Sequence, residues 1–175
     1  IKNATKIESL NPRLDFIKII NEINVSETII STEKSGIQKS AKISKYADIE
    51  PNVSIGKNTI IESFVKIHSG TIIGDNCVIK AGTSIGHNGF GFERDENETP
   101  LEFPHFGKVV IGNNVQIGSK CTVCKGALTD TLIKDYVKID DHCHIAHGCE
   151  IGSKTIITAF TTVSGSTKVG EKVYI

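Results

Sequence analysis

The chain has 175 residues, a length that fits one domain, and its 20 basic residues balance its 20 acidic residues. Because there is no basic excess, we expect no electrostatic binding to nucleic acid. The apolar runs are too short to span a bilayer, and no secretory signal pattern is present, so we expect a cytoplasmic protein. The chain begins at Ile1 and ends within a repeat, which suggests trimmed termini.

The first predicted element is a short helix. Asn11 suits the N-cap position of a helix and Pro12 suits its first turn. Apolar residues then follow on one helix face, at Leu14, Ile17, Ile20 and Ile23. We expect this helix and a polar linker at residues 25–36 to form an N-terminal segment, residues 1–36, in which the helix caps the open end of the main domain.

A six-residue repeat occupies the rest of the chain. Every sixth residue from Ile37 to Ile85 is isoleucine, and the residue two places before each is small or β-branched wherever the repeat is established. The pattern resumes at Ile111 and again at Ile133. A helix would bury residues at spacings of three and four, and an ordinary strand would alternate, so neither explains a strict spacing of six.

Each repeat therefore predicts a short strand with one large and one small inward side chain, followed by a bend. Glycine often follows the isoleucine, and it suits a bend that needs positive φ or close backbone approach. Three repeats would close one triangular coil, and stacked coils would stabilise one another. The predicted fold is all-β, a parallel β-helix over residues 37–175 with a loop inserted at residues 86–110.

The same register accounts for most of the cysteines. Four occupy the small inward position, where a free cysteine behaves as a buried apolar residue: Cys77, Cys121, Cys143 and Cys149. Cys124 completes a single C-x-x-C spacing with Cys121, which is a weak zinc signal without a second pair. Since Cys124 follows the inward Val123, we expect it to be the one cysteine that reacts quickly.

Two interruptions of the repeat are candidate functional segments. The loop between Ile85 and Ile111 holds four of the seven phenylalanines, which either pack on the solenoid or form an apolar binding wall. Four extra residues near Lys125 to Asp130 predict a bulge in one coil. Close to it, residues 139–148 hold three of the six histidines. Outward histidines on a solenoid are usually only solvated, although imidazoles also serve as bases and ligands.

Several segments together resemble a known enzyme family. They are Ser84 to Phe92, Gly107 to Gly112, Lys125 to Ile133, Val137 to His147, and Ser164 to Ser166. In order and spacing they resemble the UDP-3-O-acylglucosamine N-acyltransferases of lipid A synthesis, over about residues 50–175. The resemblance implies a left-handed β-helix, a homotrimer, and acyl transfer from a phosphopantetheine thioester to a sugar amine.

The resemblance also implies roles for single residues. It makes His147 the catalytic base, Asp140 its helper and the Gly165 N–H the oxyanion donor. Substrate contacts are expected from six more residues: Asn88, Phe90, Phe92, His105, Phe106 and His144. We expect no tightly bound cofactor and no metal, with acyl-CoA or an acyl carrier protein as co-substrate.

The sequence differs from the family in ways that favour a shorter relative. The family's uracil-binding first domain and its C-terminal helices are missing, and Cys124-Lys125 stands in place of Asp-Arg. We expect a nucleotide-linked amino sugar as acceptor, for O-antigen, capsule or lipopolysaccharide synthesis. The alternative is the lipid A enzyme itself in trimmed form.

Two further readings stay open. Carbonic anhydrases with a left-handed β-helix hold zinc with three histidines between subunits, and His142, His147 and His105 have a comparable spacing. That reading gives the phenylalanine loop no role. A scaffold without activity would explain the repeat alone.

Overall fold

The structure is a computed structural model that describes residues 8–23 and 36–175. It divides into two compact units. One contains the helix together with residues 90–104 of the inserted loop, and the other contains the repeats, residues 36–89 and 105–175. Of the predicted linker at residues 25–36, all but Gly36 lies outside the described residues.

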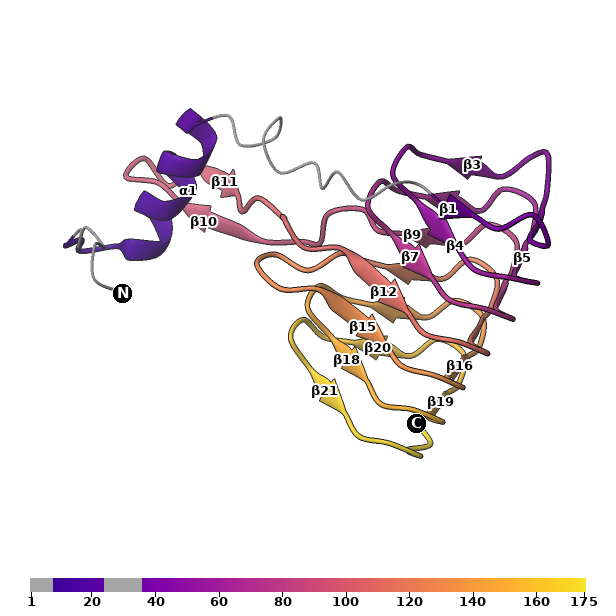
Figure 1. Ribbon diagram of the computed structural model, residues 1–175. Helices are drawn as coiled ribbons and strands as arrows, with labels where there is room; N and C mark the ends of the chain where they lie inside the picture. Colours follow the sequence, from indigo (N-terminus) through magenta and orange to yellow (C-terminus); the bar gives the residue numbers. More distant parts are fainter. Residues whose placement is uncertain (1–7, 24–35) are drawn as a thin grey trace, which may run out of the picture. The chain divides into compact units, whose positions relative to one another are not determined.

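The repeats form a parallel β-solenoid whose three sheets are the sides of stacked coils (Figure 1). The first sheet contains β1 (Gly36–Ile37), β4 (Ser54–Ile55), β7 (Ile72–Ile73), β12 (Val109–Ile111), β15 (Thr131–Ile133), β18 (Glu150–Ile151) and β21 (Lys168–Val169). The second contains β2 (Lys42–Ile43), β5 (Ile60–Ile61), β8 (Val78–Ile79), β13 (Gln116–Ile117), β16 (Lys138–Ile139) and β19 (Ile156–Ile157). The third contains β3 (Asp48–Ile49), β6 (Lys66–Ile67), β9 (Ser84–Ile85), β14 (Thr122–Val123), β17 (His144–Ile145) and β20 (Thr162–Val163). The predicted left-handed parallel β-helix of hexapeptide repeats is confirmed.

The isoleucine register is confirmed at each paired strand. Ile55 pairs with Ile73, 18 residues later, which is one coil of three repeats. Ile73 then pairs with Ile111, and Ile111 with Ile133. The longer spacings contain the inserted loop and the four-residue bulge. The paired isoleucines are buried, so the coils are held together by a continuous apolar ladder as well as by backbone hydrogen bonds.

The bends use two different devices. The left-handed residue comes three places before the large inward one, and it is often asparagine, as at Asn58 (φ 56°) and Asn76 (φ 55°). The glycine after the isoleucine usually serves close approach instead. A Cβ atom at Gly56 would lie 2.5 Å from the backbone of Gly74 in the next coil. Gly86 (φ 96°) combines both requirements.

All five cysteines are free and buried. Four confirm the predicted inward position, but the expectation that Cys124 is accessible is wrong, because its exposed fraction is 2%. Cys124 follows Val123 as Gly56 follows Ile55, and this position is crowded by the neighbouring coil. Burial raises the pKa of the Cys124 thiol to about 11.

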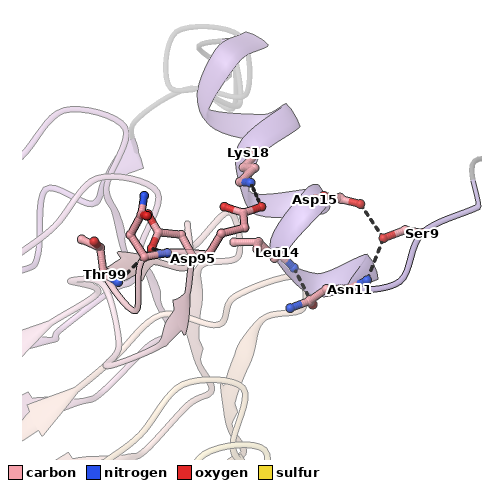
Figure 2. Close-up of polar contacts among 9 residues, drawn as sticks. Ser9, Asn11, Leu14, Asp15, Lys18, Asp95 and Thr99 are labelled. Carbon is pink, nitrogen blue, oxygen red and sulfur yellow. Dashed lines mark hydrogen bonds and ion pairs between the residues drawn. The ribbon is translucent and has the colours of Figure 1, made fainter.

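The predicted helix is confirmed as α1 (Pro12–Ile23). The Asn11 side chain accepts a hydrogen bond from the Leu14 N–H at 3.1 Å, as an N-cap should (Figure 2). In its own unit the helix packs on the hairpin of β10 (Phe92–Arg94) and β11 (Pro100–Glu102). Lys18 pairs with Glu96 at 2.5 Å (Figure 2), and Phe16 stacks on Phe103.

The interruptions of the solenoid share one row of turns, which we call the interrupted edge. It joins the third sheet to the first and consists of residues 50–53, 68–71, 86–89, 105–108, 124–130, 146–149 and 164–167. Residues 90–104 interrupt one turn of this edge in the sequence, and the four-residue bulge lies in the next turn. Because both insertions lie at this edge, the three sheets of the solenoid keep their register.

Candidate active site

The interrupted edge gathers four of the six histidines, which come from successive coils. They are His68, His87, His105 and His147. Stacked coils lie about 4.8 Å apart, so residues far apart in sequence become neighbours along this edge. The edge is therefore the part of the solenoid that concentrates groups capable of acid–base chemistry.

His147 and Gly165 occupy equivalent places in adjacent coils, 18 residues apart. A Cβ atom at Gly165 would lie 2.6 Å from both Cε1 and Nε2 of His147, so the imidazole rests on the glycine backbone. The His147 carbonyl accepts a hydrogen bond from the Ser166 N–H at 2.8 Å, which fixes the two turns relative to each other. Within the described residues the Gly165 N–H has no acceptor. An imidazole thus lies beside a turn whose backbone N–H group is open.

Two residues from the inserted loop enclose His147. The rings of His105 and His147 meet edge to face, with centroids 5.5 Å apart. A Cβ atom at Gly89 would lie 2.8 Å from Cβ of His147 and 2.9 Å from Nε2 of His105. His105 was predicted as a substrate contact and Gly89 was not. The glycines of the Asn-Gly-Phe-Gly segment were the available signal for Gly89, since they mark close backbone approach.

Asp140 does not meet His147 within one chain. It follows β16, in the turn between the second and third sheets, whereas His147 follows β17 in the next turn of the same coil. One side of the triangular coil, strand β17, therefore separates Asp140 from His147. The Asp140 carboxylate accepts a hydrogen bond from the Asp141 N–H at 2.8 Å. In the part of the chain that the structure describes, the His147 imidazole has a ring contact but no hydrogen-bond partner.

The remaining predicted substrate contacts are divided between the units. Phe90 and Phe92 belong to the hairpin unit, where their ring centroids lie 4.9 Å apart. Asn88 and Phe106 lie on the interrupted edge, and the Phe106 N–H donates to the Ala127 carbonyl at 2.7 Å. None of these contacts with substrate is tested by the geometry, and each stays a prediction.

His144 projects from the outer face of β17, between the strands of Thr122 and Thr162. Burial, and secondarily the charge of His87, lower the pKa of the His144 imidazole below its usual range. Burial therefore favours the neutral form of this ring over the charged form.

Of the three histidines named for a zinc site, His142 lies apart from His105 and His147 within one chain. His142 lies on the same turn row as Asp140, away from the interrupted edge, and stacks on Phe160 with a centroid distance of 4.9 Å. Among residues 8–23 and 36–175, no group of three His, Cys, Asp or Glu side chains is placed to hold a metal ion. The same residues contain no helix long and apolar enough to cross a bilayer.

Comparison with known proteins agrees with the repeat. Residues 52–87 and 130–165 match the family model described as bacterial transferase hexapeptide (six repeats). The chain is therefore a solenoid built from hexapeptide repeats. The predicted resemblance to UDP-3-O-acylglucosamine N-acyltransferases is also confirmed. The protein of that name from Cupriavidus metallidurans is 44% identical over 86 residues, which cover 47% of this chain and 23% of the relative.

A second relative of the same name, from Dechloromonas aromatica, is 45% identical over 80 residues, 46% of this chain and 23% of its own. The matches thus span about a quarter of these relatives. Among solved structures, UDP-N-acetylglucosamine acyltransferase from Campylobacter jejuni has a TM-score of 0.59 at 25% identity, covering 81% of this chain and 62% of that one. A hexapeptide transferase family protein from Anaplasma phagocytophilum has a TM-score of 0.61 at 17% identity, covering 78% and 70%, and supports the solenoid fold alone.

Proposed function

We propose that the chain is an N-acyltransferase, which moves an acyl group from a phosphopantetheine thioester to the amino group of a nucleotide-linked amino sugar. The observation that carries the proposal is the packing of the His147 imidazole on the Gly165 backbone. It brings a base and an open N–H group within reach of one thioester carbonyl. Names of relatives at 44% and 45% identity support the reaction class.

The proposed chemistry needs no covalent intermediate with the protein, because a thioester is already activated. The amine nitrogen attacks the thioester carbonyl, a C–N bond forms, and the C–S bond breaks. His147 accepts the proton that the amine loses and returns it to the departing thiolate, an effect worth about 10²- to 10⁴-fold. The Gly165 N–H donates to the oxyanion of the tetrahedral intermediate, which is worth roughly 3 kcal/mol.

We also propose that the working form is a homotrimer whose active sites lie between subunits. The number of subunits is inferred from the family resemblance. The need for a second chain is inferred from the geometry of a single coil. Asp140 and His147 belong to one coil and occupy different edges of it. A threefold axis parallel to the solenoid keeps equivalent coils at one height, so it can present Asp140 of one subunit to His147 of the next.

A second candidate is N-acylation of UDP-3-O-acylglucosamine in lipid A synthesis, since both curated relatives carry that name. The two candidates share the chemistry and differ in acceptor and donor. A lipid A enzyme should require an acylated sugar and an acyl carrier protein, whereas the shorter relative should use acyl-CoA with a free nucleotide amino sugar. In both cases a cytoplasmic location stays a prediction.

The test is a thiol-release assay with acyl-CoA or acyl carrier protein against a panel of nucleotide amino sugars, with UDP-3-O-acylglucosamine included. We expect release that depends on one acceptor of this class. The buried thiols of the protein should give little background. A chain that releases no thiol with any pair would support the scaffold reading instead.

A further inference from the structure

A pocket on the interrupted edge lies beside the proposed catalytic groups and contains neither of them. Its volume is about 370 Å³, and its lining residues come from four successive coils: Glu50, His68, Ser69, Gly86, His87, Asn88 and Lys125. The lining carries one carboxylate, one ammonium group and two imidazoles. The pocket is therefore built to bind a polar ligand.

The carboxylate in the pocket is already engaged. Oε1 of Glu50 accepts from Lys66 at 2.8 Å and lies 3.2 Å from Nδ1 of His68. Oε2 accepts from the Ser69 N–H at 2.9 Å. The hydrogen bond from Lys66 is the main reason that the pKa of the Glu50 carboxyl is lowered. Glu50 thus orients His68 and leaves little acceptor capacity for a cationic ligand.

The ammonium group of Lys125 is in the opposite situation. Its side chain is half-buried, and within the described residues it forms no ion pair. Burial lowers the pKa of the Lys125 amine, because the charged form loses its solvation, and the charge of Glu50 offsets this effect only in part. An anion in the pocket would restore that stabilisation, since the loss of water strengthens the attraction between opposite charges.

His87 contributes a second polar side chain to the pocket. Its Nδ1 lies 2.6 Å from the Asn88 carbonyl oxygen, so Nδ1 carries the proton in that contact. The other ring nitrogen, Nε2, has within the described chain only the Cys124 sulfur as a contact, at 3.9 Å, so this side of the ring is available to a ligand.

We infer that this pocket binds the diphosphate group of a substrate, with the Lys125 ammonium group and the His87 ring as its contacts. The inference rests on the proposed function, which supplies two substrates with this group, the nucleotide sugar and coenzyme A. Gly86 and His147 are two coils apart along the edge, about 10 Å. A sugar ring attached to a diphosphate in the pocket would thus extend toward His147, and residues 87–89 join the two places directly.

The experiment measures binding to the full chain by calorimetry, with inorganic pyrophosphate, UDP and coenzyme A as separate probes. We expect pyrophosphate to bind, and Lys125→Gln to raise its Kd by about tenfold or more, the cost of losing a charged hydrogen bond. Lys57→Gln is the matched control, since Lys57 is exposed on a different turn row. His87→Gln is a second pocket variant, which carries the test if Lys125→Gln does not fold.

The three probes distinguish the two sources of the diphosphate. Tighter binding of UDP than of coenzyme A, with sensitivity to Lys125→Gln for UDP alone, assigns the pocket to the acceptor, and the converse assigns it to the donor. No binding of any probe, or equal Kd values for wild type, Lys125→Gln and His87→Gln, would overturn the inference. Acyl transfer lost in His147→Ala with pyrophosphate binding intact would leave both proposals standing. Full activity in His147→Ala would overturn the proposed mechanism alone.

Discussion

Gly165 lies directly under the imidazole of His147, so that a single methyl group on the glycine would come within 2.6 Å of Cε1 and Nε2. That distance is shorter than any stable contact, and the ring would have to move. A glycine is therefore needed at position 165 because a larger residue would displace the His147 ring. A substitution at this position can test the ring's role without changing the rest of the fold.

The first prediction concerns this pair. Gly165→Ala should lower kcat by about tenfold or more, because the ring of His147 leaves its position, while the melting temperature changes little. Gly170→Ala is the matched control in the same last coils, since its Cβ would meet only Val173 at 3.7 Å. Equal activity in Gly165→Ala and Gly170→Ala would show that the position of the His147 ring does not matter.

The second prediction concerns the assembly. The His147→Ala and Asp140→Asn proteins should each have low acyltransferase activity when assayed alone. If one chain supplies the histidine and its neighbour the aspartate, random mixing restores about a quarter of the sites, since half of the subunits have His147 and half of their neighbours have Asp140. Mixing by unfolding and refolding, followed by an activity assay, measures this recovery. No recovery, or a monomer in analytical ultracentrifugation at micromolar concentration, would contradict a shared site.

The third prediction concerns the thiols. All five cysteines should react slowly with a thiol reagent in the native protein and rapidly after unfolding, because each is buried. Burial also raises the pKa of the Cys121 and Cys124 thiols to about 11, which leaves little thiolate at neutral pH. Rapid native labelling of any cysteine, identified by peptide mapping, would contradict the packing of the coils at that position.

The fourth prediction concerns pH. Burial lowers the pKa of both His68 and His144 in the folded chain, so the unfolded chain binds more protons near its ordinary histidine pKa of about 6.5. Their stabilising contribution is therefore complete above about pH 6.5 and is lost as the pH falls below it. The melting temperature should fall between pH 7 and pH 5.5, and should fall less in His144→Gln.

The control for this prediction is Lys42→Gln, because Lys42 projects outward from a strand of the second sheet and its replacement leaves both His68 and His144 in place. Its melting temperature should follow the wild-type pH dependence. An equal fall in wild type and in both His144→Gln and Lys42→Gln would show that His144 does not contribute.

Much of this fold follows from the sequence, because a strict period of six has one simple physical solution. Ile55, Ile73 and Ile111 stack as the register predicts, and the proximity of His147 to Gly165 follows from their separation of one coil. The error at Cys124 came from treating the place after an inward residue as outward. In stacked coils that place is instead pressed against the neighbouring turn, which Gly56 already indicates.

Other parts of the site have no periodic signal. Gly89 and His105 flank an insertion, so no register predicts that both meet His147. The pocket lining includes Glu50 and Lys125, which come from the first and the last of four successive coils. The long loop lies between these coils in the sequence and has no repeat length, so the register alone does not predict that they share a pocket. The register alone could have predicted that Asp140 and His147 lie apart, because the seven-residue step between them contains one strand and one turn.

The most direct test of the account is a comparison of His147→Ala with His142→Ala in acyl transfer measured by thiol release. Both variants remove an imidazole from the same coil, but His142 stacks on Phe160 on another edge. If His147 is the general base, His147→Ala loses about 10²- to 10⁴-fold in kcat with the fold intact, whereas His142→Ala stays close to wild type. Near-full transfer by His147→Ala, or loss of activity in His142→Ala, would contradict the proposed role of the interrupted edge.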